Sequence, residues 1–220
     1  MGLFLRTNLF RGVDQEQVYS ALEQFWSKER HQLMDGLAPN GDSYVLHEQR
    51  DGWTMLDWTK GWEWDLRRRA QLHVSRTLDC PGLLTFVYDG DLWGYELFRR
   101  GQVVDRFLQW TDTGPGFFGD LPCQGQPDVL VAQFPELELD VAHARAYLTS
   151  ISVDDPRYED FSWDEYDPRN RPARDGDRWG RLEAAVVYDF WRFLGVEARR
   201  ANHRYSFTAP VWRRFTTQPV

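Results

Sequence analysis

The chain of 220 residues carries 26 basic and 34 acidic side chains, a formal net charge of −8, and 42% of it is hydrophobic. That much apolar surface argues against disorder over the whole chain. The acidic balance disfavours nucleic-acid binding, because phosphates require clustered Lys and Arg. No apolar run approaches the ~18 residues that a membrane helix requires. The cysteines, Cys80 and Cys123, lack the spacing of a disulfide framework or of a Cys-x-x-Cys motif. We therefore expect a soluble, cytoplasmic protein that binds neither nucleic acid nor membranes.

Strands are predicted from alternating hydrophobic residues and from the turns between them. The clearest group lies between Leu83 and Trp110, where Asp89-Gly90-Asp91 and Arg100-Gly101 separate consecutive strands into a meander. Asp51-Gly52 is a strong hairpin signal earlier in the chain. About six strands are expected, over residues 3–10, 43–50, 53–58, 83–88, 92–99 and 102–110.

Two helices are predicted among these strands. Asp14 and Gln17 form a capping box at the start of an amphipathic helix over residues 14–30, and residues 62–78 keep helical spacing. The resulting order β-α-β-β-α-β is that of a split βαβ sheet. The predicted fold class is α+β, with a mainly antiparallel sheet packed against helices.

The C-terminal half is predicted to be helical and irregular. A Gly- and Pro-rich connector follows Trp110, and residues 152–178 are polar and without apolar periodicity. We expect a single domain over residues 1–220, with a sheet-forming core over 1–110 and the rest packed on it. Within residues 111–220 we expect short helices in PDVLVAQF and LDVAHARAYL, a final helix over 179–194 that Gly195 stops, and a last strand around 205–208.

The acidic segment over residues 154–167 is the most suggestive functional feature. Its carboxylates alternate with aromatic rings, a pattern that suits docking of a basic protein, since charges steer the encounter and rings supply contact area. The alternative is a lid whose rings pack back on the core. The predicted partner-binding residues are Asp154, Asp155, Tyr158, Glu159, Asp160, Trp163, Asp164, Glu165 and Asp167.

No motif predicts catalysis, a metal site or a cofactor. The five histidines are scattered, and the chain has no Gly-x-Ser-x-Gly, P-loop or dinucleotide-binding pattern. Two alternatives to the docking hypothesis remain open. One is a small hydrolase or ligand-binding domain with a Trp-lined, carboxylate-containing pocket, and the other is a homomeric assembly through the Trp-rich face. The residues for these are Trp53, Asp57, Trp58, Trp62, Glu63, Trp64, Asp65, Asp89, Asp91 and Glu96.

Four motifs resemble those of a family of soluble bacterial α+β proteins to which no activity is assigned. They are DGWTMLDW at 51–58, VYDGDLWGYELFRRG at 87–101, DRF at 105–107 and YDFWRFLGV at 188–196. The resemblance spans most of residues 3–196 and implies no catalytic residue. By analogy with other small acidic bacterial proteins, it suggests a toxin-neutralising immunity-type protein. The sequence leaves open whether the protein is a monomer or a homodimer.

Overall fold

The computed structural model describes residues 5–29, 31–35, 43–58, 64–113, 118, 121–152, 154, 170–196, 199–201, 204–206 and 212–219. Contacts divide the chain into two compact units. Unit 1 comprises Met1–Leu5, Thr85–Glu96 and Val104–Ala198, and unit 2 comprises Arg6–Leu84, Leu97–Val103 and Arg199–Val220. Each unit is described by itself.

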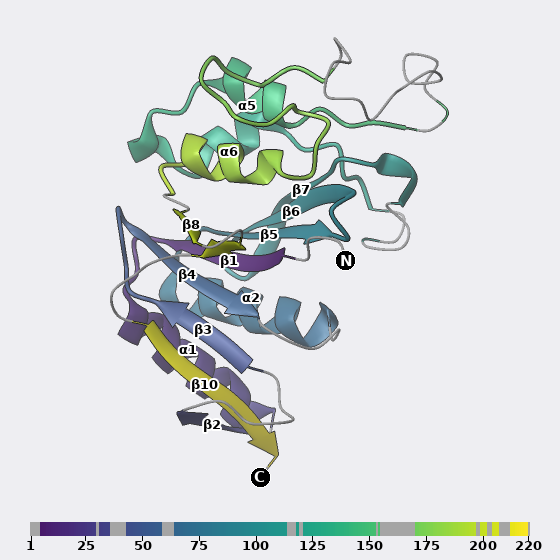
Figure 1. Cartoon of the computed structure of the whole chain (residues 1–220). Coiled ribbons are helices and arrows are strands. Elements are labelled where there is room, and N and C mark those ends of the chain that lie inside the picture. Colours follow the sequence, from purple (N-terminus) through teal and green to yellow (C-terminus); the bar gives the residue numbers. More distant parts are fainter. Residues whose placement is uncertain are drawn as a thin grey trace. The chain divides into compact units, whose positions relative to one another are not determined.

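The fold is α+β with a mainly antiparallel sheet, as predicted (Figure 1). Eight strands form one sheet in the order β2-β10-β3-β4-β1-β5-β6-β7, and β8 and β9 form a separate pair. The strands are β1 (Leu5–Arg11), β2 (His31–Asp35), β3 (Ser43–His47), β4 (Trp53–Trp58), β5 (Gly82–Tyr88), β6 (Leu92–Arg99), β7 (Gln102–Leu108), β8 (Arg199–Ala201), β9 (Arg204–Ser206) and β10 (Trp212–Pro219). The six predicted strands correspond to β1 and β3 to β7. Strands β2, β8 and β10 are not among those that the sequence predicts.

The strand order contains the predicted split βαβ arrangement. Strand β1 lies between β4 and β5, and β4 separates β1 from β3. Antiparallel pairing places Leu9 opposite Met55, and Leu46 opposite Leu56. The turn before β4 has the backbone that its residues favour, since Asp51 and Gly52 both take positive φ.

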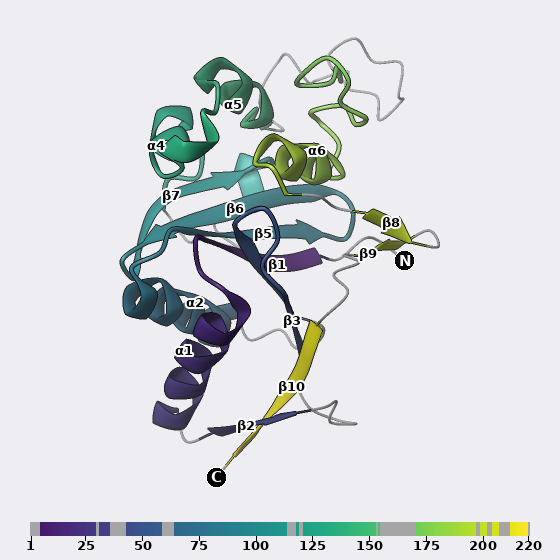
Figure 2. The same cartoon turned by 90° about the vertical axis from the view of Figure 1, so that its left-hand side faces the viewer.

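In unit 2, helices α1 (Gln15–Lys28) and α2 (Trp64–Leu78) pack side by side against one face of the strands (Figure 2). The capping box predicted for α1 is present: Asp14 Oδ1 accepts from the Gln17 N–H at 2.8 Å, and Gln17 Oε1 accepts from the Asp14 N–H at 2.9 Å. The buried core between helices and strands includes Phe10, Leu22, Phe25, Trp26, Leu56, Trp58, Val74 and Phe98.

In unit 1, helix α6 (Val186–Phe193) packs on the sheet through large aromatic side chains. The Phe190 ring lies 5.1 Å from the Trp93 ring and 5.9 Å from the Tyr95 ring. The buried Trp191 indole N–H donates to Thr85 Oγ1 at 3.0 Å. Unit 1 also contains the helices α4 (Pro127–Ala132) and α5 (Val141–Tyr147) and the short helices η1 (Thr111–Thr113) and η2 (Pro135–Leu137).

The outer edge of β7, the last strand of the sheet, is covered by residues 123–125 of the connector. Gln124 bridges Phe107 in antiparallel fashion. The Leu108 N–H donates to Cys123 O, and the Gly125 N–H donates to Arg106 O, each at 2.8 Å. This short pairing satisfies backbone groups that an edge strand otherwise leaves open.

The C-terminal predictions are confirmed in part. The two short helices are α4 and α5, and β9 lies where the last strand was expected. The final helix begins at Val186, seven residues after its predicted start at 179, because hydrogen bonds to side chains hold residues 178–182 in turns. Within the described residues no helix has the length and apolar character to span a membrane. The single-domain organisation stays a prediction.

Candidate functional site

The segment predicted to bind a partner begins at Asp154, which is exposed and whose backbone N–H donates to Ser152 Oγ at 3.2 Å. The partner-binding role of all nine predicted residues stays a prediction, and eight of them lie outside the described residues. These eight are Asp155, Tyr158, Glu159, Asp160, Trp163, Asp164, Glu165 and Asp167. The residues on both sides of this segment are described, and they show how its two ends are held.

The N-terminal end of the segment is attached beside the end of β7. Ile151 is buried and forms a parallel bridge with Trp110. The Ile151 N–H donates to Gln109 O at 2.6 Å, and the Thr111 N–H donates to Ile151 O at 2.9 Å. Ser152 Oγ adds a hydrogen bond to Asp112 Oδ1 at 2.9 Å. The backbone is therefore fixed to the sheet immediately before the acidic segment.

The C-terminal end is held through Asn170. Its Oδ1 accepts from the Leu182 N–H at 3.1 Å, and its Nδ2 donates to Glu183 Oε1 at 3.3 Å. The Gly180 N–H donates to the same Glu183 oxygen at 2.9 Å. A Cβ on Gly180 would lie 1.9 Å from Asn170 Oδ1, so this approach requires glycine. The chain is thus held again at Asn170, three residues after the acidic segment ends.

Two buried carboxylates fasten residues 174–179 to α6. Asp189 Oδ2 accepts from the backbone N–H groups of Arg178 and Trp179, each at 2.8 Å. Asp177 Oδ2 accepts from the Tyr147 hydroxyl at 2.7 Å and from the Arg174 N–H at 2.9 Å. Arg192 joins the two carboxylates.

The Arg192 guanidinium lies 2.8 Å from Asp177 Oδ1 and 3.0 Å from Asp189 Oδ1. Its side chain is 53% exposed, whereas those of Asp177 and Asp189 are 1% and 4% exposed. The arginine therefore covers the two carboxylates while keeping contact with water, which limits the cost of burying their charge.

The protonation of these groups suits a structural role. Burial raises the pKa of Asp189, although the backbone N–H groups of Trp179 and Arg178 favour its charged form. The hydrogen bond to Asp177 raises the pKa of Arg192, so the guanidinium stays charged. Burial and the bond to Asp177 raise the pKa of Tyr147, so its hydroxyl stays a donor. The network holds the backbone of residues 174–179 in place.

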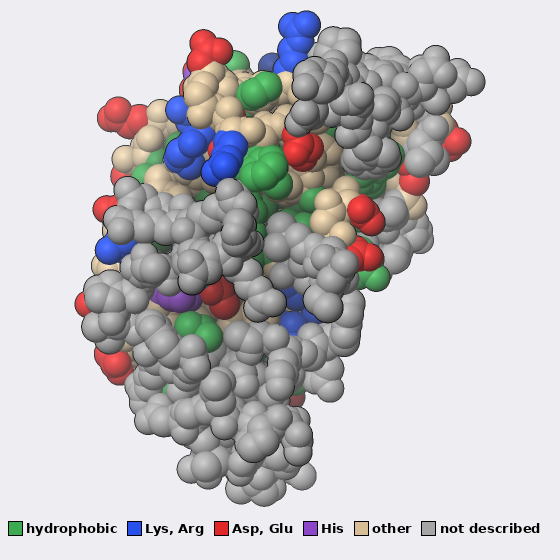
Figure 3. All heavy atoms as spheres, in the orientation of Figure 1, with side chains coloured by type: hydrophobic (Ala, Val, Ile, Leu, Met, Phe, Trp, Pro, Cys, Tyr) green, Lys and Arg blue, Asp and Glu red, His purple; other side chains and the backbone are tan. Residues whose placement is uncertain are grey.

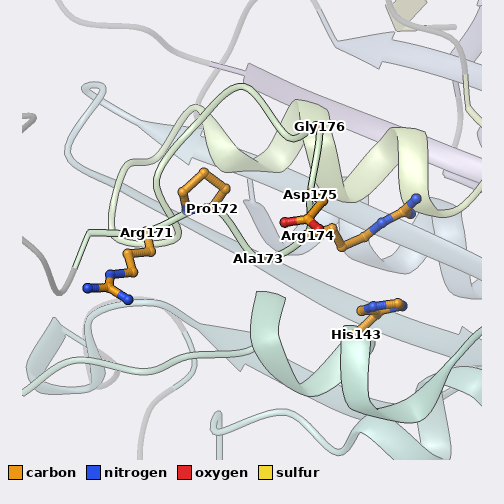
Figure 4. A pocket seen from close by; sticks show the side chains of 7 residues that line it. All are labelled: His143, Arg171, Pro172, Ala173, Arg174, Asp175 and Gly176. Carbon is orange, nitrogen blue, oxygen red and sulfur yellow. The ribbon is translucent and has the colours of Figure 1, made fainter.

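An open cavity of about 710 Å³ lies between α5 and the loop that this network fixes (Figure 4). His143 lines it from α5, and the other lining residues belong to the stretch 171–176. Sequence reasoning missed this site, because Arg171, Arg174 and His143 form no recognisable motif and become neighbours only through the folding of unit 1.

Two of the tryptophans proposed to line a pocket, Trp53 and Trp58, are used in packing within unit 2. Trp53 and Trp58 are 3% and 7% exposed. The Arg11 guanidinium lies over the Trp53 ring at 5.2 Å, and that of Arg67 lies over the Trp58 ring at 5.1 Å. Trp62, Glu63 and the side chain of Trp64 lie outside the described residues.

The carboxylates considered with those tryptophans are dispersed. Asp65 lies on α2, where its Oδ2 is 3.7 Å from Arg69 Nε. Asp89 takes positive φ in the turn before Asp91, as turn chemistry predicts. Glu96 is buried and forms an ion pair with Arg106 at 2.9 Å. The structure therefore gives these three carboxylates different local roles.

Asp57 makes two side-chain contacts that the sequence analysis does not predict. Its Oδ1 accepts from Thr7 Oγ1 at 2.6 Å, and its Oδ2 lies 2.9 Å from His47 Nε2. The carboxylate lies between the hydroxyl and the imidazole. In a nucleophilic relay the imidazole lies between hydroxyl and carboxylate, so this order does not prepare Thr7 for attack. The register that pairs Thr7 with Asp57 is what brings these residues together.

Over the described part of the chain, no three or more His, Cys, Asp or Glu side chains are grouped to hold a metal ion. The chain matches no protein-family model, no curated protein and no solved structure at a significant level.

Proposed function

We propose that the protein is a non-enzymatic interaction protein that binds a basic protein through its acidic, aromatic segment, as an immunity-type protein binds a toxin. The observation that carries the proposal is the attachment of both ends of the segment, at Ile151–Ser152 and at Asn170. A segment closed at both ends has fewer conformations to lose on binding than a free tail.

The charge pattern supplies the physical basis of recognition. Between Asp154 and Asp167 the chain has seven carboxylates and a single basic residue, Arg157. The negative potential of these carboxylates increases the rate of association with a positively charged surface, and this effect weakens as the salt concentration increases. The aromatic residues supply the large contact areas on which binding energy concentrates at interfaces. They are Tyr158, Phe161, Trp163 and Tyr166.

The proposal places the protein in the cytoplasm. Both cysteines, Cys80 and Cys123, are buried free thiols, a state that a reducing compartment maintains. The proposed partner is a protein, since a chain of net charge −8 repels nucleic acid and anionic membrane surfaces.

The test is affinity capture from the source cell, followed by kinetics with the purified partner. The variant Asp164→Lys/Glu165→Lys/Asp167→Lys reverses charge in the segment. The variant Glu23→Lys/Glu48→Lys/Glu138→Lys makes the same change of net charge at exposed carboxylates elsewhere. We expect the parent and the control to retain one stoichiometric basic protein and the segment variant to lose most of it.

With the purified partner, the segment variant should show an association rate lowered by about tenfold or more at low salt and a shallower salt dependence. Its dissociation rate should change less. Equal association rates and equal salt slopes for the two triple variants would show that another surface binds the partner.

A further inference from the structure

The cavity beside α5 carries a second, independent inference. Its volume of about 710 Å³ lies within the range of small-molecule sites. Figure 4 shows His143 below the side chain of Arg174, with Arg171 at the other end and Asp175 between them. The cavity therefore offers basic groups at two separated positions and a single carboxylate in the middle.

Arg171 and Arg174 have no acidic partner among the residues that the structure describes. Within the described residues, neither Arg171 nor Arg174 forms an ion pair, and the buried carboxylates of Asp177 and Asp189 are occupied by backbone N–H groups and by Arg192. The Arg174 guanidinium lies 5.8 Å from the centre of the Phe193 ring, a cation–π contact that holds it without neutralising it. Figure 3 shows basic side chains gathered over the region of α6.

The wall that carries these arginines is fixed before any ligand binds. The Asp177 N–H donates to Arg174 O at 3.1 Å and closes a turn in which Gly176 has a φ of +82°. Arg192 donates to Gly176 O at 2.9 Å, and the Arg181 N–H donates to Arg171 O at 3.0 Å. A rigid wall lowers the entropy lost on binding, which favours a small ligand with few contacts.

We propose that this cavity binds a small organic anion with two negatively charged ends, of the dicarboxylate or phosphate-ester class. Arg174 and His143 hold one end and Arg171 holds the other. Guanidinium groups suit this chemistry because their donors match the oxygens of carboxylates and phosphates in pairs. Asp175 accepts a hydrogen bond from a hydroxyl or amino group in the middle of the ligand, which selects against molecules without such a donor.

The test is isothermal titration of the full chain with three probes at low ionic strength: malate, succinate and 3-phosphoglycerate. Malate and 3-phosphoglycerate each carry a central hydroxyl that succinate lacks, so they test the role of Asp175. Comparing these two probes distinguishes a carboxylate from a phosphate at one end of the ligand. We expect at least one hydroxylated probe to bind with a dissociation constant below about 1 mM.

Arg174→Gln and Arg171→Gln should each weaken that binding by about tenfold, the effect of losing one charge-assisted pair. Arg145→Gln is the matched control, because Arg145 is an exposed arginine of α5 that does not line the cavity. Circular dichroism and a thermal melt confirm that each variant is folded. The proposal is overturned if no probe binds at about 10 mM, or if Arg145→Gln weakens binding as much as Arg174→Gln does.

Discussion

Asp105 is a carboxyl of unit 1 whose ionisation the fold opposes. It is 6% exposed, and its Oδ2 accepts from the Tyr95 hydroxyl at 2.6 Å and from the Gln126 N–H at 3.0 Å. Burial raises the pKa of Asp105, and the hydrogen bonds from Tyr95 and Gln126 offset only part of that rise. Burial also raises the pKa of Tyr95 well above its ordinary value, so the hydroxyl remains a donor.

The sign of the resulting pH dependence is fixed by linkage. A carboxyl with a raised pKa in the folded state contributes its full stability below the pKa of the unfolded chain, about 3.9. That contribution is lost as pH rises through the folded pKa. Asp105→Asn has the same shape and does not ionise. We therefore expect its free energy of unfolding, relative to the parent, to increase between about pH 4 and pH 7.

Urea unfolding of both proteins at several pH values measures this difference. Asp91→Asn serves as the control, because Asp91 is an exposed turn residue and its replacement should give a difference that changes little with pH. A difference for Asp105→Asn that stays constant across the range would show that the folded state does not oppose ionisation of this carboxyl.

At the scale of elements, the capping box of α1 is the feature that sequence reasoning placed most closely. Asp14→Ala removes the acceptor of the Gln17 N–H and leaves that donor without its partner. We expect a loss of about 1 kcal/mol in the free energy of unfolding, the usual cost of losing an N-cap. Chemical denaturation measures it.

Glu23→Ala is the control for this substitution, because Glu23 is an exposed residue in the middle of the same helix. Its effect should stay within about 0.5 kcal/mol. If Asp14→Ala cost no more than Glu23→Ala, the capping bonds would contribute nothing measurable to stability.

Elements with strong local signals could be predicted, and elements fixed by distant contacts could not. The hairpin at Asp51-Gly52 and the meander of β5, β6 and β7 follow from turn residues and alternation. Strand β2 could not be predicted in this way, because it has only five residues and gains its place in the sheet by pairing with β10, at the far end of the chain. The sequence predicts too early a start for α6. Asp189, a residue of the helix, accepts hydrogen bonds from the backbone of residues 178 and 179 and so holds these residues outside the helix.

The candidate functional site also has a part that the sequence predicts and a part that it does not. The acidic segment is visible in the sequence because its composition differs from that of its surroundings. The cavity is not visible there, because His143 and Arg174 are separated by the acidic segment and by the residues that join it to α5. The buried carboxylates of Asp177 and Asp189 hold the wall of the cavity in place. The sequence does not predict that these two aspartates are buried.

At the scale of the whole molecule, each compact unit contains one cysteine: Cys80 lies in unit 2 and Cys123 in unit 1. Burial raises the pKa of Cys80 to about 12 and raises that of Cys123 as well. Both thiols should therefore resist a thiol reagent in the native protein and react when the unit around them opens.

The single variants Cys80→Ser and Cys123→Ser report on one unit each. Because β5, β6 and β7 contribute residues to both units, we expect the two units to unfold together. Labelling in increasing denaturant should then give the same midpoint for both variants, after correction for each variant's stability measured by circular dichroism. Midpoints that differ beyond that correction would show that one unit opens while the other stays folded.

The short cap of residues 123–125 over β7 has a consequence for assembly. An unprotected outermost strand is a template on which a second molecule adds its own strand, and this route leads to open-ended fibres as readily as to dimers. With Cys123 O and the Gly125 N–H already bonded to β7, that route is closed from Arg106 to Leu108. For this protein to self-associate by extending the sheet at this edge, residues 123–125 would first have to dissociate from β7.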